Sequence, residues 1–228
     1  MDLRFRPMPG LTAAVLVCLP LLIGLGVWQY QRWQWKTGVL AEIDAAVTAP
    51  PLDGLGALAA ANGPLDFRRI QFEGTATGET YLLYRPDGDI AWMPVRVVES
   101  GAQRVLVGFP TVQRTEADIE FVPTLDGPRA GYVRRIRARG GAARLFGVDS
   151  VPTENRWYDI NPDGAWLPGA ELYIDASLGA RDAAALPVRR PDVPNNHVSY
   201  MFTWWSFAVI LLVIYAVLHV RAGRLGRA

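Results

Sequence analysis

The sequence predicts an α+β membrane protein in which two transmembrane helices flank an external domain, a mostly antiparallel β barrel or sandwich with a few helices. Two observations lead to this prediction. No Asp, Glu, Lys or Arg occurs in residues 7–31 or in residues 193–220, and short runs of alternating apolar and polar residues fill the chain between them. Half of the 228 residues are apolar and only 20% are charged, which is more apolar than an ordinary soluble domain.

About 20 apolar residues in a helix cross a hydrocarbon core of about 30 Å. Each charge-free stretch is long enough to do so, and the chain therefore divides into five predicted parts. They are a cytoplasmic tail at 1–10, a transmembrane helix at 11–31, a periplasmic α+β domain at 32–193, a second transmembrane helix at 194–220 and a cytoplasmic tail at 221–228.

The first apolar stretch has an alternative interpretation as a cleaved signal peptide. No small-x-small cleavage site follows it, whereas an aromatic run of Trp28, Tyr30, Trp33 and Trp35 does. Aromatic side chains gather where a retained helix leaves the bilayer. We therefore interpret the segment as an anchor.

Arginines at the two ends of the chain set the predicted orientation. Arg4 and Arg6 precede the first helix, and three arginines follow the second, at positions 221, 224 and 227. The positive-inside rule then places both tails in the cytoplasm. The stretch before Leu11 is too short for a mitochondrial presequence, so we expect a multi-pass protein of a bacterial plasma (inner) membrane.

The predicted external domain begins with a helical pattern at 37–47, which Pro50 and Pro51 end. Short strands are then expected at 69–75, 80–85, 91–98, 104–112, 132–139, 157–160 and 171–176, with turns at Asp87-Gly88 and Asp163-Gly164. Period-two alternation puts Arg135, Arg137 and Arg139 on one face of a strand. That face has two interpretations. It is a landing surface for acidic lipid headgroups or for an acidic partner, or it is simply a solvated surface.

The composition excludes several classes of protein. A formal net charge of +1 provides no basic footprint for nucleic acid. A single cysteine, Cys18, excludes an intrachain disulfide, and two histidines are too few for a three-histidine metal site. We find no phosphate-binding loop or nucleophile elbow. The sequence therefore names no catalytic residue and predicts a protein that is not an enzyme.

The least ordinary residues lie where the first helix ends and the second begins. Gln29, Arg32 and Lys36 share one helix face, and Asn195 or Asn196 is suited to cap the second helix just before His197. If both tails are cytoplasmic, these stretches are neighbours at the outer membrane surface. The aromatic residues beside them are Trp28, Tyr200 and Trp204.

These stretches resemble the surfeit-locus (Shy-type) family of cytochrome c oxidase assembly factors. Residues 26–36 are similar to the family's Gly-x-Trp-Gln-x-x-Arg-x-x-Trp-Lys run, and residues 194–208 to its Pro-Asn-Asn-His-x-x-Tyr-x-x-Thr-Trp run. Residues 155–159 resemble its Asn-x-Trp-Tyr-x-x-Asp segment in part, since the aspartate comes one place early. The chain departs from the family at Gly108-Phe109-Pro110, where an Asn-Arg-Gly-Trp turn is usual.

The resemblance implies an assembly factor for haem-copper oxidase that binds haem a or hands it to the nascent catalytic subunit. The haem a synthesis machinery and membrane lipid are then further partners. The cofactor-binding residues implied are His197, as the tentative ligand of the haem iron, together with Trp28, Gln29, Arg32, Lys36, Asn195, Asn196, Tyr200 and Trp204.

Three alternatives stay open. The first is that His197 is an interfacial histidine that hydrogen-bonds a carbonyl. We expect His219 to be an interfacial residue at the cytoplasmic side. In the second alternative, the whole protein is a membrane scaffold that stabilises an oxidase assembly intermediate without binding haem. A membrane enzyme or sensor with a pocket in the outer domain is the third alternative, but the sequence names no residues for it.

Overall fold

A computed structural model describes residues 3–87, 89–112, 125–137, 140, 147–191 and 194–227. The chain divides into two compact units. Met1–Ala41 together with Asp192–Ala228 form one, called here the helical unit. Glu42–Pro191 form the other, called here the sheet unit.

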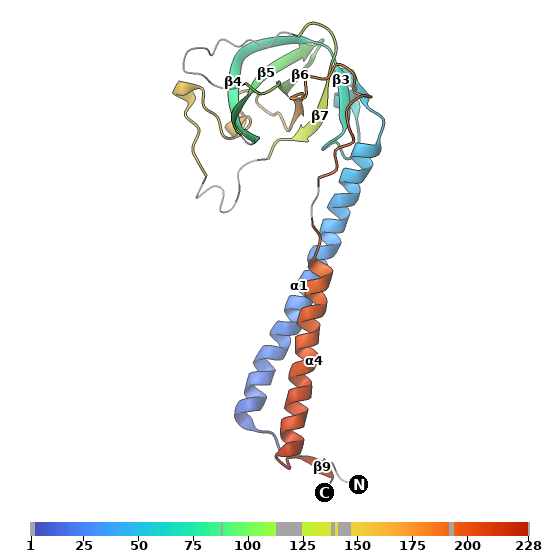
Figure 1. The fold of residues 1–228 in the computed structure, drawn as a ribbon, viewed down its shortest axis with the longest axis vertical. Helices are drawn as coiled ribbons and strands as arrows, with labels where there is room; N and C mark the ends of the chain where they lie inside the picture. The colour runs from blue at the N-terminus through green and yellow to red at the C-terminus, as the bar shows by residue number, and fades with distance from the viewer. Residues whose placement is uncertain are drawn as a thin grey trace. The chain divides into compact units, whose positions relative to one another are not determined.

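Two long helices dominate the chain, α1 (Pro9–Thr48, 40 residues) and α4 (His197–Arg221, 25 residues). Both are long and apolar enough to cross a membrane. In the helical unit they run side by side (Figure 1). Pro20 is accommodated within α1.

The helical pattern predicted at 37–47 is confirmed, and it is part of α1, which continues into it from the first apolar stretch without a break. The physical reason is the composition of the joining segment. Residues 31–37 contain glutamine, arginine, tryptophan and lysine but no glycine or proline, so nothing there stops the helix. It ends at Thr48, just before the proline pair at positions 50 and 51.

At the far end of the helical unit, β1 (Leu3–Phe5) pairs antiparallel with β9 (Leu225–Arg227). His219 lies beneath this ribbon and is 0% exposed. Its Nε2 accepts a hydrogen bond from the backbone N–H of Met8 at 3.2 Å, and its Nδ1 donates to the carbonyl of Tyr215 at 2.8 Å. The expected interfacial histidine is therefore a buried residue that ties the N-terminal arm to α4.

The sheet unit holds one mixed sheet of seven strands and the short helix α2 (Gly54–Ala60). The strands are β2 (Leu52–Asp53), β3 (Arg69–Phe72), β4 (Thr75–Asp87), β5 (Asp89–Ser100), β6 (Gln103–Gly108), β7 (Arg129–Arg135) and β8 (Leu172–Asp175). Their order is β2-β3-β7-β8-β6-β5-β4, and only the pairs β2–β3 and β6–β8 are parallel.

Successive side chains of a strand point to opposite faces of the sheet. Both faces of this sheet are covered, and each contributes to a separate apolar core. Val105 and Val107 of β6 belong to the core that α2 covers, whereas Leu106 belongs to the core that Trp166 and Leu167 cover. The α+β class and the mostly antiparallel pairing are confirmed. The sheet is open, however, with β2 and β4 at its edges, so the closed barrel is not formed.

Asn155 and Trp157 form hydrogen bonds with backbone groups at the free edge of β4. These groups therefore have partners without closure of the sheet into a barrel. Asn155, in a left-handed conformation (φ 50°), accepts from the N–H of Leu82 and donates to the carbonyl of Thr80. Trp157 then exchanges backbone hydrogen bonds with Leu82 and Tyr84. The prediction of a strand at 157–160 is wrong beyond this single bridge.

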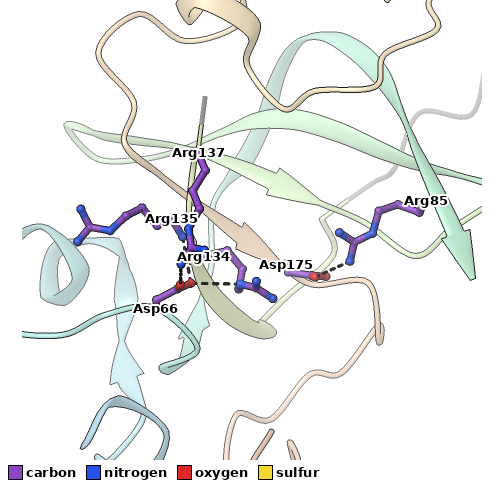
Figure 2. A network of polar contacts seen from close by, with 6 residues as sticks. All are labelled: Asp66, Arg85, Arg134, Arg135, Arg137 and Asp175. Atoms are coloured by element: carbon purple, nitrogen blue, oxygen red, sulfur yellow. Dashed lines mark hydrogen bonds and ion pairs between the residues drawn. The ribbon is translucent and has the colours of Figure 1, made fainter. Parts of the chain in front are cut away.

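The predicted strand at 132–139 also ends early, because β7 stops at Arg135. Asp66 accepts hydrogen bonds from the guanidinium of Arg134 (3.2 Å), from that of Arg137 (3.1 Å) and from the backbone N–H of Arg135, as Figure 2 shows. Two of the arginines near this strand end are therefore paired with one carboxylate. Arg139 lies outside the described residues.

Candidate functional site where α1 meets the start of α4

The structure brings together the two stretches around positions 30 and 197. The closest contact joins Nδ1 of His197 to Oε1 of Gln29, 2.7 Å apart across 168 residues of sequence. About two turns further along α1, Lys36 donates a hydrogen bond to the carbonyl of Pro194, and Thr37 accepts one from Asn195 at 3.4 Å. Three contacts therefore fix the middle of α1 against the start of α4 and the residues just before it.

The contact with Gln29 bears on where the proton of the imidazole lies. Oε1 of Gln29 is an acceptor, so this arrangement matches the tautomer that carries its proton on Nδ1 and donates it to Gln29. The lone pair of the neutral ring is then on Nε2. Gln29 is 9% exposed, and His197 is the first residue of α4. The ring is thus held at a helix start with one nitrogen anchored and the other available as a ligand.

Close packing of α1 against α4 beside this contact supports it. Gly26 lies three residues before Gln29, and the indole ring of Trp205 rests directly on its backbone. A Cβ at position 26 would overlap that ring. Met201, one turn after His197, is buried. Small residues let helices approach closely in this way.

The side chains of Lys36 and Asn195 join α1 to the residues just before α4. The groups that make these contacts are therefore not available to a ligand. Asn195 uses its amide N–H, but its Oδ1 is buried and has no hydrogen-bond partner among the described residues. Asn196 is at the N-cap position of α4, and its exposed side chain makes no cap hydrogen bond. The expected side-chain cap is therefore not formed.

The remaining predicted site residues are not brought to His197 by any described contact. The guanidinium of Arg32 lies 4.0 Å from the ring centre of Trp35, on its own helix. Trp28 and Tyr200 are exposed. Trp204 packs edge-on against Phe207, with ring centres 6.1 Å apart.

This donor set suits one kind of metal centre. Among the described residues, no group of three or more His, Cys, Asp or Glu side chains could hold a bare ion. A single imidazole is instead sufficient for a metal that arrives in a macrocycle supplying its other ligands, as in haem. A guanidinium and exposed aromatic rings are the groups that could bind the carboxylates and ring of such a macrocycle. Arg32, Trp28 and Tyr200 are of these types, but no described contact brings them to His197.

Comparison with known proteins decides the family. The model of the SURF1 family matches residues 16–209, which include both stretches of the site. The chain belongs to the SURF1 family. The family predicted from the three motif blocks is therefore confirmed.

Relatives in the SURF1 family are distant in sequence but similar in extent. A SURF1-like protein of Monosiga brevicollis is 26% identical over 94% of this chain and 89% of its own length. Surfeit locus protein 1 of Homo sapiens is 26% identical over 85% of this chain and 73% of its own. A SURF1-like protein of Rickettsia conorii is 24% identical over 89% and 88% respectively.

The structure also explains the two places where the chain departs from the motif pattern we associate with the SURF1 family. Asn155 caps β4 and accepts a hydrogen bond from the indole N–H of Trp157 at 2.9 Å, so this block shapes the sheet unit. Gly108 ends β6 with Met93 packed where a Cβ would be, and Phe109 is buried. An apolar contact thus occupies the turn where an arginine is usual.

Two contributors to the site were missed from the sequence, Gly26 and Thr37. A glycine inside an apolar helix is a signal for close packing, and it points to Gly26. Thr37 carries no comparable signal in the sequence.

The sheet unit has a cleft of its own, which the sequence did not predict. Its volume is about 640 Å³, and several carboxylates line it together with Arg137. The acidic residues are Asp149, Asp159, Asp163 and Glu171. None of these belongs to a described cluster that could hold a metal ion, and the cleft offers no histidine or cysteine ligand.

Proposed function

We propose that this protein is an assembly factor for haem-copper (cytochrome c) oxidase that binds haem a and passes it to the nascent catalytic subunit. The observation that carries the proposal is the anchored imidazole of His197, whose Nε2 is left available by the bond from Nδ1 to Gln29. Membership of the SURF1 family supports the link to oxidase assembly.

In this proposal α1 and α4 cross the bacterial plasma membrane, with both ends of the chain in the cytoplasm and residues 32–193 outside. The length and apolar composition of the helices support it. The contact between Gln29 and His197 then lies at the outer surface of the membrane, beside the aromatic side chains that favour that depth. A large apolar cofactor can reach such a site from the lipid.

When bound, haem a would supply an iron that takes an imidazole ligand. His197 would hold that iron through Nε2, with its Nδ1 oriented by Gln29. Arg32 is exposed and places its guanidinium over the ring of Trp35, where its N–H groups would suit a propionate. The first N–H groups of α4 have no partner within the helix and favour negative charge at the same end.

The test is the visible spectrum of the full-length protein, purified in detergent after co-expression with the haem a synthesis machinery. We expect a haem absorbance band in the wild type and in the control Ser199→Ala, which alters an exposed side chain in the same turn. We expect the band to be lost in His197→Ala.

A colourless wild-type protein from membranes that contain haem a would contradict the cofactor role. It would favour the second candidate, a scaffold that stabilises an oxidase assembly intermediate. The engagement of Lys36 and Asn195 in contacts within the chain is the observation that favours the scaffold. Restoration of oxidase assembly by His197→Ala in a deletion strain would support the same reading.

A further inference from the structure

We propose that Gln29 is a positioning residue that sets the tautomer of His197 and so prepares Nε2 to bind iron. This inference rests on the proposed function, since it concerns the same imidazole. It adds a role for a residue of α1 that touches neither the iron nor the porphyrin.

Hydrogen-bond chemistry supports the role. With Oε1 of Gln29 at 2.7 Å, a neutral imidazole completes this hydrogen bond when its proton is on Nδ1. Without that acceptor the proton is free to move to Nε2, and the lone pair moves to the wrong nitrogen for ligation. Histidines that bind metals usually donate their other N–H to an oxygen, and loss of that partner costs 10- to 100-fold in affinity.

The surroundings of Gln29 make this bond a fixed feature. Gln29 is almost fully buried, and Gly26, one turn earlier, is packed against Trp205 of α4. The side chain of Gln29 is thus confined between the helices, next to the ring it orients. Gln34, about one and a half turns later in α1, offers a comparison: its amide donates to the hydroxyl of Tyr30 on the same helix at 2.8 Å.

The first arm of the test needs no haem. The chain has two histidines, so ¹⁵N labelling of histidine in the full-length protein in detergent gives two sets of ring signals, which His197→Ala assigns. We expect His197 to carry its proton on Nδ1 in the wild type, in Gln29→Glu and in the control Gln34→Leu. We expect a shift toward the Nε2-protonated form in Gln29→Leu.

The second arm is titration with haemin. We expect Gln29→Leu to bind 10- to 100-fold more weakly than wild type, and Gln29→Glu and Gln34→Leu to bind like wild type. Gln29→Glu shows that a loss in Gln29→Leu comes from the missing acceptor and not from misfolding.

The two arms separate failure of this inference from failure of the proposed function. An Nε2-protonated His197 in the wild type, or an unchanged tautomer in Gln29→Leu, overturns the role of Gln29 whether or not haem binds. Equal haemin affinity of Gln29→Leu and wild type also overturns it. If wild type and His197→Ala bind haemin alike, the proposed cofactor role fails, while the tautomer arm still decides what Gln29 does.

Discussion

Gly26 shows how one missing side chain shapes the site. The ring of Trp205 occupies the space that a Cβ would need, whereas Gly24, two residues earlier, has open space around it. The two glycines lie in the same apolar segment of α1 and differ only in what faces them. Close approach of the helices at Gly26 is what allows the next turn to place Gln29 against His197.

We predict that Gly26→Ala destabilises the helical unit by about 1–3 kcal/mol, the usual cost of overpacking. Gly24→Ala is the matched control. It should be neutral or stabilising, because alanine is the better helix former by up to about 1 kcal/mol. Thermal unfolding of both variants in detergent, followed by tryptophan fluorescence, measures the difference. Equal melting curves would show that Trp205 does not rest on Gly26.

Tyr173 in β8 makes the stability of the sheet unit depend on pH. Burial raises the pKa of its phenol above the usual 10.0, and the nearby carboxylate of Asp175 raises it further. A raised pKa in the folded state means that folding favours the neutral phenol. Its contribution is therefore complete below pH 10 and is lost as the pH rises through the folded pKa.

We accordingly predict that resistance to urea falls only as the pH rises above about 10, the ordinary pKa of tyrosine. Tyr173→Phe has no proton to lose and should reduce that fall. Tyr200→Phe, which removes an exposed hydroxyl, should leave it unchanged. A fall of the same size in Tyr173→Phe would assign the effect to other groups.

At the scale of the elements, the ribbon of β1 and β9 depends on one histidine. The ring of His219 lies between the N-terminal arm and α4, with the ring of Phe5 5.4 Å away and that of Tyr215 4.1 Å away. It satisfies the N–H of Met8 and the carbonyl of Tyr215 together. A neighbouring bond joins the hydroxyls of Thr12 and Tyr215 at 2.8 Å.

We predict that His219→Ala loosens the N-terminal arm, because a buried N–H without a partner costs about 1–3 kcal/mol. Hydrogen exchange at the amide of Met8 should become about 10- to 100-fold faster. Tyr215→Phe keeps the carbonyl and the ring and removes only the bond to Thr12, so exchange at Met8 should change little. Unaltered exchange in His219→Ala would mean that the arm is held by other contacts.

The helices and most strands could be predicted because their signals are local. Freedom from charge identified both long helices, and period-two alternation located β3 to β8 to within a few residues. The failures come from contacts between distant residues. His219 is buried by an arm more than 200 residues earlier, and the strand expected at 157–160 is replaced by the hydrogen bonds of Asn155 to β4. Neither contact has a local sequence signal.

The candidate site was predictable only in part, for the same reason. The topology of two returning helices predicts that Gln29 and His197 are neighbours, and the structure places them in contact. It does not predict which polar residue turns inward. Lys36 reaches the carbonyl of Pro194, while Arg32 stacks on Trp35 of its own helix. Such choices depend on the helix rotation that Gly26 and Trp205 impose.

At the scale of the whole molecule, the sheet unit is inserted in sequence between the two halves of the helical unit. The contacts between α1 and α4 follow one antiparallel alignment from end to end. His197 meets Gln29, Tyr215 meets Thr12, and His219 meets Met8. A single alignment that satisfies both ends leaves little freedom for one helix to slide along the other.

The central claim is that α1 and α4 meet at Gln29 and His197, and cross-linking in membranes tests it most directly. In a Cys18→Ser background, which removes the single native cysteine, cysteines are introduced in pairs and treated with a short bismaleimide. We predict an intrachain cross-link for the pair at 29 and 197 and for the positive control at 12 and 215, but none for the pair at 34 and 197. A cross-link at 12 and 215 without one at 29 and 197 would contradict the account.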